Sequence, residues 1–274
     1  MMNRLFPNSA FAEVSVIVAA IAAGPLLLLV WSAFYASSCV VLLIPLLIVM
    51  VLTIATREQL RQRRRCVANC YFVSGSLLHR LVSSTKLVTL LSLAVSVGLT
   101  TLLLASVPGW GLPVLGLLAL DAVLIALLYF GLLRAASSGL RVRGPFRYLF
   151  ARRWAVMVNL PLVLTALLWL QLQQPPPLWL DGAMNLEETL RAASESVGSQ
   201  CPLIDKVVRL NMEKDAFSWW LTLKGSGFID DSRLRWVAWL LFLLSGTLAL
   251  WAYSRLCVYL ISSAHHRLLP PDYE

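Results

Sequence analysis

Six long apolar stretches constrain this chain more than any other feature of its sequence. The hydrocarbon core of a bilayer is about 30 Å thick, and a helix needs about 20 apolar residues to cross it. The stretches that meet this condition are 14–34, 39–56, 87–107, 112–133, 154–170 and 236–254. Hydrophobic residues make up 59% of the 274 residues and charged ones 14%, against about 45–50% and 25% in soluble domains. We therefore predict an all-α integral membrane protein in which residues 1–274 form one domain, a six-helix bundle.

Short connections join several of these stretches. Only residues 35–38 separate the first two stretches, and residues 108–111 separate the third from the fourth, so both pairs are predicted to form tight helical hairpins. Pro25, Pro45 and Pro161 lie inside apolar stretches. Proline removes a backbone hydrogen bond from a helix, so we expect kinks at these positions.

The distribution of basic residues predicts the orientation of the bundle. Connections on the cytoplasmic side of a membrane carry an excess of Lys and Arg. Residues 57–86 and 134–153 together carry thirteen basic residues against one acid, Glu58, whereas residues 172–235 carry seven basic residues and nine acids. With six spans, we expect a bacterial inner-membrane protein with both termini in the cytoplasm and residues 172–235 in the periplasm.

The basic inner connections are predicted to contact anionic lipid headgroups or partner proteins. Each basic residue near such a surface contributes about 1 kcal/mol. The residues assigned to this contact are Arg57, Arg61, Arg64, Arg65, Arg147, Arg152 and Arg153. The first four would share one face if the second helix continued beyond the membrane. Nucleic acid is not expected as a partner, because the aromatic residues between Arg147 and Trp154 are typical of a membrane interface.

A short apolar stripe follows in the first inner connection, at residues 77–82. Its spacing is typical of an amphipathic helix. Such a helix either lies in the membrane interface or docks a cytoplasmic partner, and the sequence does not distinguish the two.

Residues 172–235 are predicted to fold into a cap over the outer end of the bundle. Asn185 and Glu188 have the spacing of a capping box at the start of a helix that ends near Val197. Pro202 is suited to the first turn of a second helix, and Phe217, Trp219 and Trp220 indicate a return to the membrane surface. A connection of this length with two helices is too ordered for a simple linker.

Asp121 is the principal candidate for a functional residue, because it is an acid near the middle of the fourth stretch. A charged residue at this depth costs about 2.5–3.5 kcal/mol, so it is expected to face other helices. Ser96 and Thr100 of the third stretch are at comparable depth and are the expected hydrogen-bond donors. Asp121 is then either a helix-packing residue or part of a substrate or proton path.

Residues suited to catalysis are scarce. The three histidines, His79, His265 and His266, all lie outside the apolar stretches, and the chain has no phosphate-binding G-x-x-x-x-G-K-[ST] motif. We expect no enzyme activity, no bound metal and no cofactor.

Cys39 and Cys201 are the two cysteines expected in the outer compartment, where a disulfide can form. A bridge between them would require Cα atoms within about 7 Å. Nothing in the sequence places the cap over the first hairpin, and cysteine is also a common small apolar residue. We therefore expect two free thiols, with the bridge as the alternative.

Two functions fit this organisation. The absence of catalytic clusters and the ordered outer segment favour a scaffold or anchor subunit of a membrane complex in the cell envelope. Alternatively, six spans, an amphipathic segment after the second span and a helical outer segment before the sixth resemble the topology of the permease half of an ABC-2-type exporter. That resemblance implies a separate cytoplasmic ATPase that meets residues 57–86.

Overall fold

The computed structural model describes residues 7–71, 84–140, 142, 144–173, 185–223 and 232–268. Within these residues all regular structure is helical, as predicted. The elements are α1 (Pro7–Phe34), the 3₁₀ turn η1 (Cys39–Leu42), α2 (Leu43–Tyr71), α4 (Thr85–Ser106), the 3₁₀ turn η2 (Val107–Gly109), α5 (Leu112–Ser138), α6 (Gly144–Gln173), α8 (Leu186–Glu195), α9 (Pro202–Leu223) and α10 (Ser232–Leu268).

Within the part of the chain that the structure describes, five helical segments are long and apolar enough to cross a membrane. They are Val14–Phe34, Cys39–Arg61, Thr85–Gly109, Leu112–Ser138 and Phe146–Leu170. These match the first five predicted stretches. The sixth, 236–254, falls within α10, where the side chains of residues 232–245 lie outside the described part of the chain. The count of six spans therefore stays a prediction.

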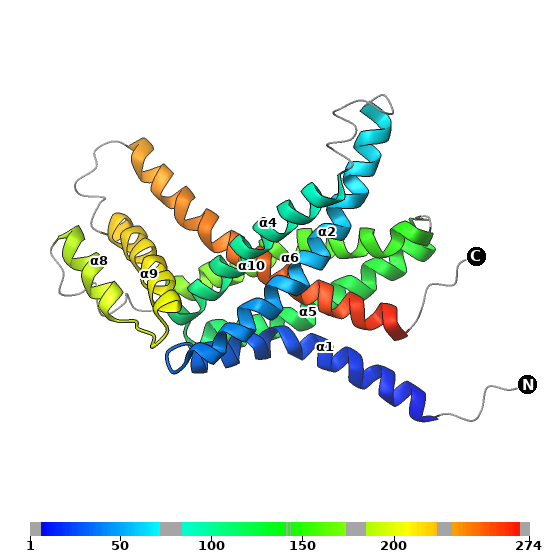
Figure 1. Ribbon diagram of the computed structural model, residues 1–274, viewed down its shortest axis with the longest axis horizontal. Coiled ribbons are helices and arrows are strands. Elements are labelled where there is room, and N and C mark those ends of the chain that lie inside the picture. The colour runs from blue at the N-terminus through cyan, green and yellow to red at the C-terminus, as the bar shows by residue number, and fades with distance from the viewer. Residues whose placement is uncertain are drawn as a thin grey trace, which may run out of the picture.

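The helices are arranged around α10, which runs diagonally across the molecule and packs against α1, α4 and α6 (Figure 1). The α1–α2 turn lies at one end of the molecule, beside α8 and α9 (Figure 1). The start of α1, the end of α10 and the α5–α6 connection lie at the opposite end, which we call the terminal end (Figure 1). The start of the first helix, the end of the last helix and the α5–α6 connection thus share one end of the bundle.

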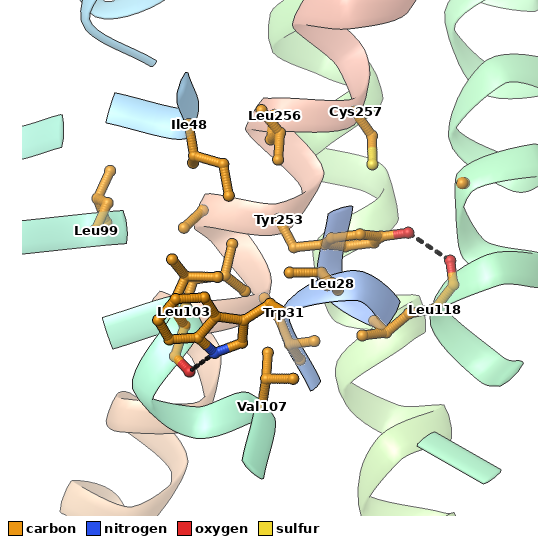
Figure 2. Packing of buried hydrophobic residues seen from close by; sticks show 14 of the residues in the cluster. Leu28, Trp31, Ile48, Leu99, Leu103, Val107, Leu118, Tyr253, Leu256 and Cys257 are labelled. Atoms are coloured by element: carbon orange, nitrogen blue, oxygen red, sulfur yellow. Dashed lines mark hydrogen bonds between the residues drawn. The ribbon is translucent and has the colours of Figure 1, made fainter. Parts of the chain in front are cut away.

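The core lies where α1 crosses α4, α5 and α10. The Trp31 indole of α1 donates a 2.9 Å hydrogen bond to the Leu104 carbonyl of α4, and the Tyr253 hydroxyl of α10 donates one of 2.5 Å to the Leu118 carbonyl of α5 (Figure 2). A Cβ atom at Gly24 would lie 2.6 Å from the Cys257 sulfur. Glycine at this position therefore allows α1 and α10 to cross closely.

The prolines have different consequences. Pro25 and Pro161 lie inside α1 and α6, as predicted. Pro45 lies in the first turn of α2, directly after the 3₁₀ turn, and not in the middle of a straight span. Backbone N–H groups in the first turn of an α-helix have no partner within the helix, so proline is well tolerated there and the kink expected at Pro45 is not required.

Helix α2 continues well beyond the apolar stretch that begins it. It extends through Arg57, Arg61, Arg64 and Arg65 to Tyr71 as one continuous helix, which is the condition under which these residues were expected to share one face. The side chains from residue 62 onward lie outside the described part of the chain, as does the whole apolar stripe at 77–82.

Helices α8 and α9 pack against each other and form the cap (Figure 1). The Asn185 backbone N–H donates a 3.4 Å hydrogen bond to the Glu188 carboxylate, which confirms the predicted start of α8. Helix α9 begins at Pro202, also as predicted. It then continues without a break through Phe217 and Trp219 to Leu223, so this region extends the second cap helix.

Candidate functional site

Asp121 belongs to a polar cluster enclosed by three helices. Its side chain on α5 is 4% exposed and lies among helices, as expected for an acid in an apolar span. The Asn159 amide of α6 donates a hydrogen bond of 3.2 Å to the Asp121 carboxylate and one of 3.4 Å to the Ser254 hydroxyl of α10. Asn159 and Ser254 are fully buried. One amide therefore connects the three helices.

Sequence analysis missed Asn159. The available signal was that Asn159 is the only amide or charged residue between Trp154 and Leu170. A lone amide in an apolar span needs a partner, because an unpaired polar group in hydrocarbon is costly. Pairing it with the lone acid of another span would have been a reasonable inference.

The expected donors to Asp121 occupy other positions. The Ser96 hydroxyl donates a 2.7 Å hydrogen bond to the Ser92 carbonyl on its own helix. The Thr100 hydroxyl is buried and has no hydrogen-bond partner. The reason is the packing order: α4 packs mainly on α2 and α10, whereas α5 packs on α6 and α1. Within the described residues neither α4 and α5 nor α1 and α2 pack closely against each other, so the tight helical hairpins predicted at both short turns are wrong.

Two further polar side chains of α10 extend the cluster. The Tyr253 hydroxyl binds the Leu118 carbonyl, and the Cys257 thiol lies one helical turn further along α10 (Figure 2). Leu118 is one helical turn from Asp121. Cys257 is a free, fully buried cysteine. The phenol of Tyr253 and the thiol of Cys257 thus lie on α10, the helix that also carries Ser254 of the cluster.

The cluster has the capacity to hold one proton. The oxygen of the Asn159 amide, Oδ1, is buried without a hydrogen-bond partner. A protonated Asp121 carboxyl has one donor, and a half-turn of the amide would present Oδ1 to it. The Ser254 hydroxyl meets an amide here and not a base, so this geometry does not activate it as a nucleophile. The arrangement is suited to holding helices together.

A second polar cluster joins helices at the terminal end. Arg255 of α10 is 8% exposed and donates hydrogen bonds of 3.2 Å to the Thr56 hydroxyl and 2.9 Å to the Gln59 side-chain carbonyl. Its guanidinium also lies 4.9 Å from the centre of the Trp251 ring. An arginine thus ties α10 to the point where α2 leaves its apolar segment.

The arginines assigned to headgroup contact have different environments. Arg152 forms a 3.0 Å ion pair with Glu58 and lies 5.8 Å from the centre of the Tyr259 ring, so it is engaged within the chain. Arg147 donates a hydrogen bond to the Val142 carbonyl, and Arg153 is exposed. Arg57 and Arg61 are half-buried, and the side chains of Arg64 and Arg65 lie outside the described part of the chain.

The cap is fixed to the α1–α2 turn by a disulfide. Cys39 and Cys201 are bonded, with Cα atoms 5.0 Å apart, so the expectation of two free thiols was wrong. Adjacent contacts explain the approach. The Gln200 N–H donates a 3.1 Å hydrogen bond to the Ala36 carbonyl, and the Ser199 hydroxyl donates one of 2.6 Å to the Tyr35 carbonyl. The start of α9 therefore lies directly on the α1–α2 turn.

A second contact holds the cap against the end of α4. The Asn211 amide of α9 donates a 3.1 Å hydrogen bond to the Ala105 carbonyl. At Gly109, just beyond α4, a Cβ atom would meet the Met212 sulfur at 3.6 Å, an ordinary contact distance. The cap is thus attached near two separate turns between helices, which limits its rotation about either one.

Asp205 holds the turn between the two cap helices. Its carboxylate accepts hydrogen bonds of 3.0 Å from the Ser199 N–H and 2.8 Å from the Arg209 guanidinium. The Arg209 hydrogen bond, followed by that of Ser199, keeps the pKa of Asp205 below its ordinary value. Arg209 also donates to the Ser194 carbonyl at the end of α8.

The five long apolar helices indicate a multi-pass helical membrane protein. The chain matches no protein-family model, no curated protein and no solved structure.

Proposed function

We propose that this protein is a non-catalytic scaffold subunit of a bacterial inner-membrane complex. In this proposal six helices span the membrane, both termini face the cytoplasm and the cap, with the rest of residues 172–235, faces the periplasm. The cap presents a surface to an envelope partner, and the arginine-bearing extension of α2 presents one to a cytoplasmic partner. Anionic headgroups at the terminal end help to position the bundle.

The attachment of the cap is the observation that carries the proposal. A disulfide and hydrogen bonds to Ala36, Tyr35 and Ala105 fix α8 and α9 to the bundle. A surface held in this way loses little conformational freedom when a partner binds, which favours affinity. Leu203, in the first turn of α9, is 65% exposed beside the disulfide and offers an apolar contact. A substrate path has less support, since Asp121 and Asn159 are enclosed by helices.

Affinity purification from the source organism tests the scaffold proposal. The tagged chain in mild detergent is expected to bring down one or more envelope proteins that crosslink to the cap. Leu203→Asp should reduce their recovery severalfold. Glu187→Ala, at an exposed position on the other cap helix, is the matched control and should leave recovery unchanged. Equal recovery with both variants, or a chain that crosslinks to nothing, contradicts the proposal.

The exporter alternative is favoured by one observation. Helix α2 extends to Tyr71 and projects from the bundle at the end away from the cap (Figure 1). A rigid basic helix of this kind is a suitable contact for a cytoplasmic ATPase. Recovery of an ATP-binding cassette protein that is lost in Arg61→Glu and kept in Leu203→Asp supports the exporter, whereas the reverse pattern supports the scaffold.

Cysteine labelling in intact cells tests the orientation. Single cysteines introduced at Arg63 and Arg147 should resist a membrane-impermeant reagent, and one at Asn185 should react. Labelling from outside at either arginine position would reverse the assignment of the two ends.

A further inference from the structure

A hollow of about 510 Å³ lies between the cap and the end of α4. One wall is formed by Thr101, Leu102 and Ala105 of α4, and the other mainly by Val207, Leu210 and Phe217 of α9. The volume lies within the range of about 300–1,000 Å³ that is typical of small-molecule sites. Apart from the polar residues at one side, the lining is apolar, so it fits a hydrocarbon chain.

The position of the hollow relative to the bilayer identifies its occupant. The α4 wall belongs to the segment Thr85–Gly109, which is apolar and long enough to cross a membrane, and it lies in the last third of that segment. The opposite wall belongs to the cap. If this segment crosses a bilayer, the hollow extends across the level at which hydrocarbon gives way to headgroups. The molecules present at this level are phospholipids, with an apolar tail below and a polar head above.

Charged groups border the hollow on the α9 side. Lys214 and Glu213 are half-buried neighbours there. The Lys214 ammonium forms a 3.0 Å ion pair with Asp215. An ammonium has three donors, so this ion pair leaves Lys214 able to bind a phosphate. The Glu213 carboxylate beside it is complementary to a cationic amine. A positive and a negative group side by side match a zwitterionic headgroup.

The geometry points to a structural lipid site, in which one acyl chain of a zwitterionic phospholipid fills the hollow between α4 and α9 and its headgroup lies against Lys214 and Glu213. The lipid completes the packing between the cap and the membrane surface. This inference needs only that the cap lies at a membrane surface, and it holds whether the protein is a scaffold or an exporter subunit.

Native mass spectrometry of the full chain provides the test. Delipidated protein is mixed in detergent with phosphatidylethanolamine, with phosphatidylglycerol or with diacylglycerol, all carrying the same acyl chains. We expect one phosphatidylethanolamine to be retained on the intact protein, and the other two to be retained less. Equal retention of diacylglycerol would contradict the proposed contact of the headgroup with Lys214 and Glu213. Retention of no lipid would overturn the site.

Substitutions that fill the hollow locate the bound lipid. Thr101 and Leu210 are exposed positions in opposite walls, Leu210 being 67% exposed, so Thr101→Trp and Leu210→Trp add volume with little loss of packing. Each should lower the lipid-bound fraction about tenfold, equivalent to about 1.4 kcal/mol. Leu203→Trp is the matched control, since Leu203 is 65% exposed on the same helix but does not line the hollow.

The outcomes separate the possible occupants. A lipid lost in Leu210→Trp and kept in Leu203→Trp supports the site. Equal loss in both variants means that the lipid lies elsewhere on the cap, and a polypeptide retained in place of lipid means that the hollow is a protein interface. Because the two filling substitutions are on different helices, failure of one variant to fold leaves the other decisive.

Discussion

Asn159 and Asp121 are 38 residues apart in the sequence, and a hydrogen bond of 3.2 Å joins their side chains inside two apolar helices. Each is unfavourable in a membrane on its own, and each is the partner that the other needs. The same amide reaches Ser254, so a single side chain sets the relative position of α5, α6 and α10.

Removing one member of this pair should destabilise the bundle. Hydrogen bonds between membrane helices average about 0.6 kcal/mol and reach about 1.7 kcal/mol. We expect Asn159→Leu and Asp121→Leu to be coupled by this amount, so that the double variant is more stable than the sum of the two single losses. Unfolding in mixed detergent micelles measures the coupling in a double-mutant cycle. A coupling of zero would show that the hydrogen bond contributes nothing.

Cys39 and Cys201 should resist alkylation until the protein is reduced. Under denaturing, non-reducing conditions we expect modification of Cys257 but not of these two, and mass spectrometry of the peptides distinguishes them. The chain-entropy model assigns about 5 kcal/mol to a bridge across 162 residues, usually an overestimate. Cys201→Ser should therefore lower Tm clearly. Alkylation of all three residues without reductant would contradict the bridge.

The contact between the cap helices should weaken in acid. Because Arg209 and Ser199 hold the pKa of Asp205 below its ordinary value, Asp205 stabilises the folded cap at pH values above the unfolded pKa. That contribution disappears as the pH falls through the lower, folded value. Asp205→Asn should be less stable than the native chain near neutral pH and should lose this pH dependence. Thermal unfolding between neutral pH and about pH 2, compared for the two chains, gives the result.

Gln59 should tolerate glutamate better than leucine. It accepts the shorter hydrogen bond from the buried Arg255. Hydrogen bonds to charged groups contribute about 1.5–3 kcal/mol, so Gln59→Leu is expected to be destabilising by an amount of that order. Gln59→Glu keeps the acceptor and adds an opposite charge, so it should retain most of the stability. If both variants unfold alike, the contact between α2 and α10 depends on packing and not on Arg255.

Much of the helical organisation was predictable because it depends on local patterns. Apolar runs of the required length gave five helices close to their observed positions, and the Asn185–Glu188 pair located the start of α8. The spacing of the arginines was compatible with the extension of α2 but did not by itself predict it. Each of these inferences uses residues within a few turns of one another.

The contacts between distant segments were harder to predict. Neighbouring helices joined by a short turn were assumed to pack together, and that assumption assigned Ser96 and Thr100 to Asp121. In the structure α1 packs beside α5, and Trp31 of α1 bonds to α4. The disulfide was disfavoured for a related reason, because no local pattern indicates which turn the cap covers. The lone amide Asn159 was visible in the sequence, but its partner depended on the packing order.

The Cys39–Cys201 bridge can form only late in the synthesis of the chain. Cys39 is made 162 residues before Cys201, and ribosomes add about 5–20 residues per second. Cys39 is therefore made about 10–30 s before Cys201, and α4, α5 and α6 are made in that interval. Until then only noncovalent contacts with helices that are already made, such as α4 and α5, hold the first two helices. The bridge thus forms late in biogenesis and joins the first turn between helices to a segment that is made much later.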